Sequence, residues 1–156
     1  MCTGGPLATP SNSKSPVHHP QATLARRKEF SAAHFYSQPA FSEAENRAHF
    51  GACYTPFGHG LNYLLEVFIA GPIDPQSRWV MNLSELDEIL AQVVKPLDHK
   101  HLNFDVPAFH KQIPTTENIA VYLWQKLHSL IEKTKGVRIE RLRLFETADL
   151  WVEVRK

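Results

Sequence analysis

The stretch of residues 61–70 constrains the fold most, because its apolar side chains recur with the period of a β-strand. One face of such a strand carries Tyr63, Leu65, Val67 and Ile69. The other face carries Leu64, Glu66 and Phe68. The sequence Gly-Pro-Ile-Asp-Pro at 71–75 is typical of a turn and ends the segment. We therefore predict a strand at 61–70.

Three further segments have the composition of strands. Residues 28–36 combine aromatic and small side chains without Gly or Pro, and a polar, Pro-containing loop is expected at 37–46. Near the C-terminus, strands are expected at 137–145 and 150–155. In the last of these, one face is formed by Leu150, Val152 and Val154.

Two helices are predicted between these strand pairs. The sequence Ser-Glu-Leu-Asp at 84–87 resembles a capping box, apolar residues then recur at helical spacing, and Pro96 ends the helix. The second helix begins with Thr116 as N-cap and finds its C-terminal cap at Gly136. Its apolar stripe consists of Ile119, Tyr122, Leu123, Leu127, Leu130 and Ile131.

The order strand, strand, helix, helix, strand, strand favours an α+β fold, a four-stranded antiparallel sheet with two helices on one face. Its sheet edges would be exposed, and oligomerisation commonly covers such edges. A single domain is expected at 27–156. The N-terminal residues are rich in Ser, Pro, Gly and Thr and lack the apolar run of a signal peptide. We therefore expect a disordered tail at 1–26 on a cytoplasmic protein.

The charge balance argues against two classes of partner. Lys and Arg number 17 against 16 Asp and Glu, a formal net charge of +1, so neither a nucleic acid nor a membrane surface is expected as partner. The two cysteines, Cys2 and Cys53, make no disulfide framework. Nine histidines are many for 156 residues, and several surround Cys53 in the sequence.

Three polar segments contain residues that a fold alone does not require, and two of them are 30–34 and 97–103. In 30–34, His34 lies on a predicted strand, although a single strand histidine is more often only hydrogen-bonded. In 97–103, Asp98 precedes His99, and a carboxylate can fix an imidazole tautomer and raise its basicity. Neighbours in an extended segment point to opposite sides, so a solvated polar loop explains the second segment about equally well.

The third segment, 50–63, combines a thiol with an imidazole. Gly58 and Gly60 flank His59 directly before the predicted strand, and glycines let a backbone approach a ligand closely. A loop separates Cys53 from His59, so the two side chains could border one cavity. A turn and a buried thiol without chemistry remain an equal alternative.

Read in order, short motifs over about residues 30–154 resemble the 6-pyruvoyl-tetrahydropterin synthase / 6-carboxytetrahydropterin synthase family. The motifs are FSAAH at 30–34, Cys53 with GHGLNY at 58–63, MNL at 81–83, LDHKHLN at 97–103, PTTEN at 114–118 and FET at 145–147. Each motif is weak alone, and the series in this order is specific. The resemblance implies the tunnelling fold and a homohexamer, a dimer of trimers with active sites between subunits.

In that family a zinc ion is held by three histidines, one from the FSAAH-like strand and two from a Gly-His-Gly-His motif. His34 and His59 match the first two positions, and Leu61 stands at the third. Side chains 59 and 61 point to the same side of an extended segment, so Leu61 would direct an apolar group to the place of an imidazole. We expect zinc to be weakly bound, absent, or completed by another histidine, His49 first and His101 second.

The resemblance also implies the remaining roles. Cys53 matches the catalytic cysteine, whose thiolate requires a nearby cation or metal that lowers its pKa. Asp98 and His99 match a proton relay, and Glu146 matches the catalytic-site carboxylate that anchors the pterin through its two oxygens. A segment that helps to seat the pterin matches Thr115, Thr116 and Glu117.

The implied activity is that of a lyase on 7,8-dihydroneopterin triphosphate or a related dihydropterin. Triphosphate is eliminated with zinc as Lewis acid, giving 6-pyruvoyl-tetrahydropterin or, on the route to queuosine, 6-carboxytetrahydropterin. The alternative is a paralogue that binds pterin but has lost or altered the lyase chemistry, which Leu61 favours. A purely structural oligomer is the third hypothesis. Against it stand the four matched residues Cys53, Asp98, His99 and Glu146.

Overall fold

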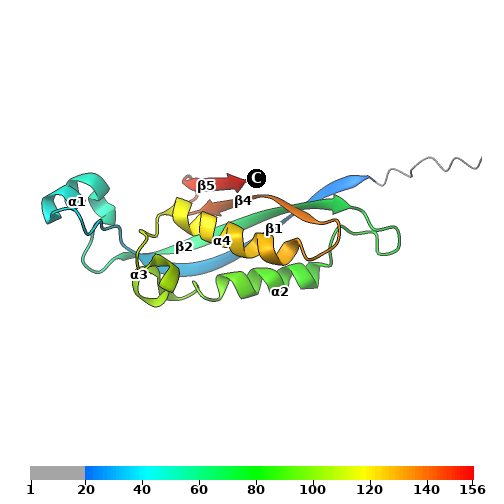
Figure 1. The fold of residues 1–156 in the computed structure, drawn as a ribbon, viewed down its shortest axis with the longest axis horizontal. Coiled ribbons are helices and arrows are strands. Elements are labelled where there is room, and N and C mark those ends of the chain that lie inside the picture. Colours follow the sequence, from blue (N-terminus) through cyan, green and yellow to red (C-terminus); the bar gives the residue numbers. More distant parts are fainter. Residues whose placement is uncertain (1–19) are drawn as a thin grey trace, which may run out of the picture.

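The computed structural model of this chain describes residues 20–156, which form one sheet and a layer of helices (Figure 1). The sheet has five strands in the order β3-β1-β2-β4-β5. Their bounds are β1 Gln21–His34, β2 His59–Pro72, β3 Lys100–His101, β4 Arg138–Phe145 and β5 Trp151–Arg155. The α+β class is confirmed. The predicted four-stranded sheet gains a short fifth strand, β3, which pairs in parallel with β1.

A long antiparallel pair, β1 with β2, forms the centre of the sheet and is its central hairpin. Its register runs from Gln21 opposite Pro72 to His34 opposite His59. Both strands begin before their predicted starts at 28 and 61. The prediction missed the extra residues because they are mostly exposed and show no clear apolar alternation. Of the tail predicted at 1–26, residues 1–19 lie outside the described part, and residues from Gln21 onward belong to β1.

The helices are α1 Glu43–Phe50, α2 Leu83–Val94, α3 Leu102–Asp105 and α4 Thr116–Ile131. The predicted loop at 37–46 therefore runs into a helix, α1, which Ser42 and Glu45 cap through a capping box. The two predicted N-caps lie one or two residues from the observed ones. The N-caps of α2 and α4 are Asn82 and Thr115, each of whose side chains accepts a backbone N–H of the first turn.

The predicted C-terminal cap of the second long helix was wrong as well. Helix α4 ends at Ile131 with Glu132 as its C-cap, and Gly136 instead has a φ of 80° in the turn that leads into β4. A positive φ is readily accessible to glycine, so Gly136 still has a local role in redirecting the chain.

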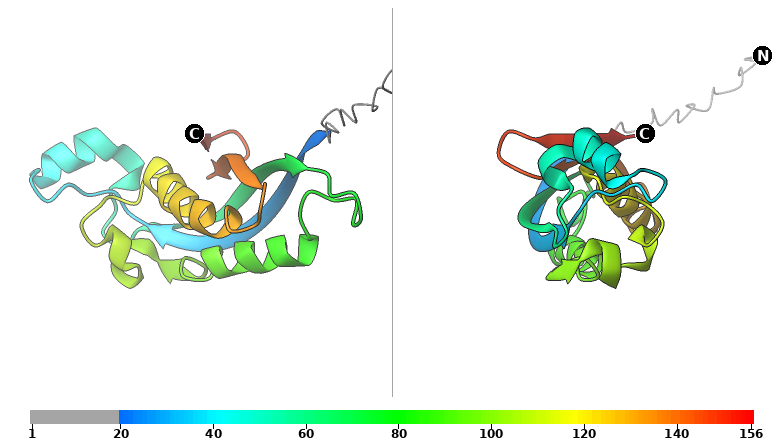
Figure 2. Two further views of the ribbon diagram at one scale, coloured as in Figure 1. Left: turned by 45° about the vertical axis from the view of Figure 1, so that its right-hand side comes forward. Right: turned by 90° about the vertical axis from the view of Figure 1, so that its left-hand side faces the viewer.

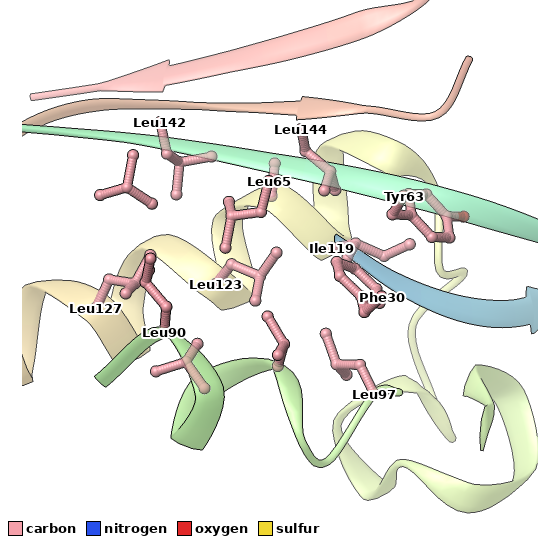
Figure 3. Packing of buried hydrophobic residues seen from close by; sticks show 14 of the residues in the cluster. Phe30, Tyr63, Leu65, Leu90, Leu97, Ile119, Leu123, Leu127, Leu142 and Leu144 are labelled. Atoms are coloured by element: carbon pink, nitrogen blue, oxygen red, sulfur yellow. The ribbon is translucent and has the colours of Figure 1, made fainter. Parts of the chain in front are cut away.

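Helices α2 and α4 cover one face of the sheet, and α1 projects from one end of the molecule (Figures 1 and 2). The core lies between these layers. Leu90, Leu123 and Leu127 of the helices are fully buried against Leu65, Leu142 and Leu144 of the strands (Figure 3). Burial of this kind of side chain stabilises a fold by about 1.5–3 kcal/mol each. In residues 20–156 no helix is long and apolar enough to span a membrane.

Truncating the centre of this core is expected to destabilise the protein. Leu123→Ala should lower the free energy of unfolding by about 2–5 kcal/mol, because the lost methyl groups leave a cavity between α4 and the sheet. Gln125→Ala, at an exposed position of the same helix, should change it by less than about 0.5 kcal/mol. Denaturant unfolding followed by circular dichroism compares the two variants. Equal effects would contradict the packing described here.

Candidate active site and metal centre

Two histidines face each other where β1 ends and β2 begins. His34 and His59 are register partners, and their Nε2 atoms lie 3.0 Å apart. His34 is completely buried and His59 is partly buried. The antiparallel pairing thus brings together two imidazoles that are separated by 25 positions in the chain.

The tautomer of His34 follows from its neighbours. Its Nδ1 lies 2.9 Å from the carbonyl oxygen of Pro114 and 3.0 Å from the hydroxyl of Tyr63. Because a carbonyl only accepts, Nδ1 carries the proton and donates it to Pro114, which directs the Nε2 lone pair toward His59. An outer hydrogen bond of this kind orients the imidazole ligands of metal sites.

The protonation state of His34 also suits a ligand. Burial first, and then the neighbouring His59, lower the pKa of His34 to about 4, although the Pro114 carbonyl opposes the shift. The ring is therefore neutral near pH 7, as metal coordination requires. The Nδ1 atom of His59 is buried without a hydrogen-bond partner among the described residues.

A carboxylate completes the group. Donor atoms of His34, His59 and Glu146 all lie within 4.8 Å of one another, so the three residues could hold a metal ion. Glu146 directly follows β4, and its carboxylate accepts a hydrogen bond from the hydroxyl of Thr116. Thr116 is the first residue of α4, which fixes that hydroxyl at the end of the helix that covers the sheet.

Leu61 lies on the face of β2 that its spacing from His59 predicts. It pairs with Ala32, two positions from the His34–His59 pair, and its side chain packs against the edge of the core. Side chains two apart on a strand share a face, so Leu61 does point to the side of His59. A leucine has no donor atom, and the third donor of the group is Glu146.

The structure does not bring His49, the expected replacement ligand, into this group. His49 lies on α1, and its ring contacts those of Phe41 and Phe50. Its place at the projecting end of the molecule could not be read from its distance to Cys53 in the sequence. His101 lies nearer the site, and both of its ring nitrogens are buried without a partner in the described chain.

Cys53 ends a short 3₁₀ helix, Gly51–Cys53, and its carbonyl accepts the backbone N–H of Tyr36 at 2.9 Å. Burial and then the charge of Glu146 raise the pKa of the Cys53 thiol. Burial and then Glu146 likewise raise the pKa of Tyr36 to about 12. Cys53, Tyr36 and Glu146 are thus electrostatic neighbours, and a cation between them would favour the thiolate.

Asp98 and His99 lie elsewhere. Asp98 Oδ1 accepts the backbone N–H of Ser31 at 2.9 Å and lies 2.9 Å from His99 Nδ1. The pair borders a hollow with Ser31 and Asn62, whose side chains face away from the face that carries His34. The His99 ring is 82% exposed. One chain therefore forms the predicted relay pair but does not join it to Cys53.

The three residues of the predicted pterin-seating segment have different surroundings. Thr115 uses its hydroxyl to cap α4, Thr116 reaches Glu146, and Glu117 is exposed. The sequence reasoning missed Tyr63 and Pro114, which hold His34. A tyrosine on the buried face of a strand needs a partner for its hydroxyl, and that requirement was the available signal for Tyr63.

The chain matches known proteins over nearly all of the described residues. The sequence model of the family described as 6-pyruvoyl tetrahydropterin synthase matches residues 23–156. The 6-pyruvoyl tetrahydrobiopterin synthase of Homo sapiens is 41% identical over 128 residues, which cover 81% of this chain and 86% of that protein. The Drosophila melanogaster enzyme of the same name is 44% identical over 115 residues, 73% of this chain and 68% of that protein.

Solved structures agree with this assignment. The structure of Caenorhabditis elegans 6-pyruvoyl tetrahydropterin synthase superposes with a TM-score of 0.82 at 33% identity, covering 88% of this chain and 97% of that chain. A Plasmodium vivax structure with a TM-score of 0.66 at 21% identity supports the fold alone. The chain belongs to the 6-pyruvoyl tetrahydropterin synthase family.

The charge of Glu146 is expected to control the acidity of Cys53. In metal-free protein, Glu146→Gln should lower the pKa of the Cys53 thiol, because the carboxylate that disfavours the thiolate is removed. The pH dependence of iodoacetamide alkylation measures that pKa, in a Cys2→Ser background so that only Cys53 reacts. Glu132→Gln, at the far end of α4, is the control. An unchanged or higher pKa in Glu146→Gln would contradict the proximity of the two groups.

Proposed function

We propose that this protein is a zinc-dependent lyase that converts 7,8-dihydroneopterin triphosphate to 6-pyruvoyl-tetrahydropterin. The observation that carries the proposal is the convergence of His34, His59 and Glu146 at the end of the central hairpin, close to Cys53. Relatives named 6-pyruvoyl tetrahydrobiopterin synthase are 41–44% identical. An Archaeoglobus fulgidus relative named for the 6-carboxy product is 34% identical over 98 residues, which favours the pyruvoyl product.

The metal of this proposal binds at His34 and His59. Both rings lie on one face of the hairpin, and the neutral state of His34 leaves its Nε2 lone pair available. Zinc supplies a Lewis acid that polarises the oxygens of the substrate side chain when it is bound. The choice of zinc follows from the family and from the imidazole donors.

The protein's own groups divide the remaining work. Glu146 and Thr116 seat the pterin ring, since a carboxylate accepts hydrogen bonds from ring N–H and amine groups. Cys53 as thiolate takes a proton from the substrate side chain, and the positive charge of the metal favours that thiolate. His99, held by Asp98, moves a proton on the other face of the substrate.

A neighbouring subunit supplies His99 in this account. The support is its position on the opposite face of the sheet from His34, with an exposed ring whose Nδ1 lies 2.9 Å from Asp98. A homohexamer, two trimers with sites between subunits, brings such faces together and also covers the exposed sheet edges. The enzyme acts in the cytoplasm on a small-molecule substrate.

The second candidate is a paralogue that binds pterin without zinc-dependent lyase activity. Leu61 favours it, because a complete three-histidine set is missing from the hairpin. The pterin-binding groups Glu146 and Thr116 would serve both candidates equally. Catalysis therefore distinguishes the two, and binding of pterin does not.

Two variants test the lyase proposal and its division between subunits. Wild-type protein loaded with zinc should release triphosphate from 7,8-dihydroneopterin triphosphate, and Cys53→Ala or His99→Ala should reduce the rate about 10²-fold or more. His128→Ala, at the exposed C-terminal end of α4, should leave the rate unchanged. The measurements are the release of inorganic triphosphate and the identification of the pterin product by mass spectrometry.

Mixed oligomers separate the two subunit arrangements. Co-expressed Cys53→Ala and His99→Ala chains should recover about a quarter of wild-type activity, since random assembly completes about one shared site in four. No recovery would contradict a site that draws His99 from a neighbour. Wild-type protein that contains zinc and binds the substrate but releases no triphosphate would contradict the lyase and leave the pterin-binding paralogue.

A further inference from the structure

The hairpin end offers two imidazoles where a catalytic zinc normally has three protein ligands. Leu61 shares the face of His59 but packs its side chain against the core and donates nothing. A third donor atom that lies within 4.8 Å of both imidazole donors comes from a segment distant in sequence, the residue that follows β4. We propose that Glu146 is the third protein ligand, so that this chain has a His34–His59–Glu146 metal site. The inference rests on the proposed metal at His34 and His59.

The distances suit such a site. Zinc binds imidazole nitrogen and carboxylate oxygen at about 2.0–2.2 Å, which places ligand atoms of a tetrahedral site roughly 3.3 Å apart. The two Nε2 atoms are 3.0 Å apart, and all three donors fall within 4.8 Å. Two histidines and a glutamate are also a ligand set used by catalytic zinc enzymes, with a fourth position left for water or substrate.

The surroundings orient two of the three proposed ligands, His34 and Glu146. The Pro114 carbonyl fixes the tautomer of His34 from behind, and the Thr116 hydroxyl holds one oxygen of Glu146. Among the described residues only Thr116 hydrogen-bonds to that carboxylate, which leaves its other oxygen for the metal. The oxygen held by Thr116 is then the one that accepts from the pterin ring in the proposed function, because a carboxylate oxygen has two lone pairs. Partners of this kind set the direction of a metal's ligands. Thr116 thereby acts as a positioning residue.

Charge gives a second reason. Glu146 is partly buried, and no ion pair in residues 20–156 involves it. Its neighbours are neutral or acidic groups, namely the thiol of Cys53 and the hydroxyls of Tyr36 and Tyr63. A divalent cation between this carboxylate and two neutral imidazoles would complement its negative charge.

His101 is the competing third ligand, because both of its ring nitrogens are buried without a partner in the described chain. Its backbone pairs with Ala33, however, whose side chain points to the face opposite His34. The ring contacts the tilted rings of Phe35 and Phe104, and its donors do not join the group formed by Glu146. The observations therefore favour Glu146.

The experiment is a double-mutant cycle on zinc affinity in the full-length oligomer. Metal-stripped protein is titrated with Zn²⁺ against a chromophoric chelator near pH 7. Loss of an outer-shell partner of a metal ligand costs about 10–100-fold in affinity, so Glu146→Gln, which removes a direct ligand, should cost about 100-fold or more. Glu132→Gln, an exposed carboxylate at the end of α4, should change the affinity by less than about threefold.

Restoring an imidazole at position 61 distinguishes a ligand from a structural residue. Leu61→His should bind zinc at least as tightly as wild type, and adding Glu146→Gln to it should cost less than about threefold, because three histidines then suffice. Zinc retained by the double variant also demonstrates that Glu146→Gln folds. His101→Ala should change the affinity by less than about threefold.

Two results would overturn the inference alone. Wild-type affinity in Glu146→Gln would remove it as a ligand, and a large loss in His101→Ala would assign the third position to His101, while zinc binding at His34 and His59 would stand. If neither wild type nor Leu61→His binds zinc, the proposed metal itself falls, and this inference falls with it.

Discussion

The register of the central hairpin is the constraint on which the site depends. Pairing of His34 with His59 follows from a ladder that extends without interruption to Gln21 and Pro72 at the other end. A slip by one residue would turn the side chains of one strand to the opposite face, separating the imidazoles and exposing Tyr63 and Leu65 together. The same apolar alternation that builds the core therefore holds the two nitrogens 3.0 Å apart.

Burial gives this pair its chemical character. His34 lies at the end of the strand that carries the buried Phe30 and Ala32, and it is excluded from water like them. Exclusion from water keeps the ring neutral, and the Pro114 carbonyl decides which nitrogen keeps the proton. Glu146 adds a negative charge to a region of neutral groups. The region could thus hold a divalent cation, which would reverse the unfavourable setting of Cys53.

The sequence predicted the elements that have a strong apolar period. Strand β2 and helices α2 and α4 were found, since half of each is buried and the pattern records that burial. Helix α1 was missed because it is polar and mostly exposed, although its Ser42–Glu45 capping box was readable. The two-residue strand β3 has no pattern of its own and exists through its contact with β1.

The sequence named the residues of the candidate site but did not predict their arrangement. Motifs named His34, His59 and Glu146, but their separation in the chain gave no distance between them. The same limit applies to His49. Its proximity to Cys53 in the sequence suggested a metal ligand, but His49 lies on the projecting helix α1, where its ring contacts Phe41 and Phe50. This limit also hid the position of Asp98 and His99 on the sheet face opposite His34, where the backbone N–H of Ser31 holds the Asp98 carboxylate.

Anomalous diffraction at the zinc absorption edge, from crystals of zinc-loaded full-length protein, tests the central claim most directly. The account predicts one peak per chain between His34, His59 and Glu146, with bonds of about 2.0–2.2 Å to one atom of each residue. An absence of any peak at the hairpin end, or a peak bound by His101 in place of Glu146, would contradict it.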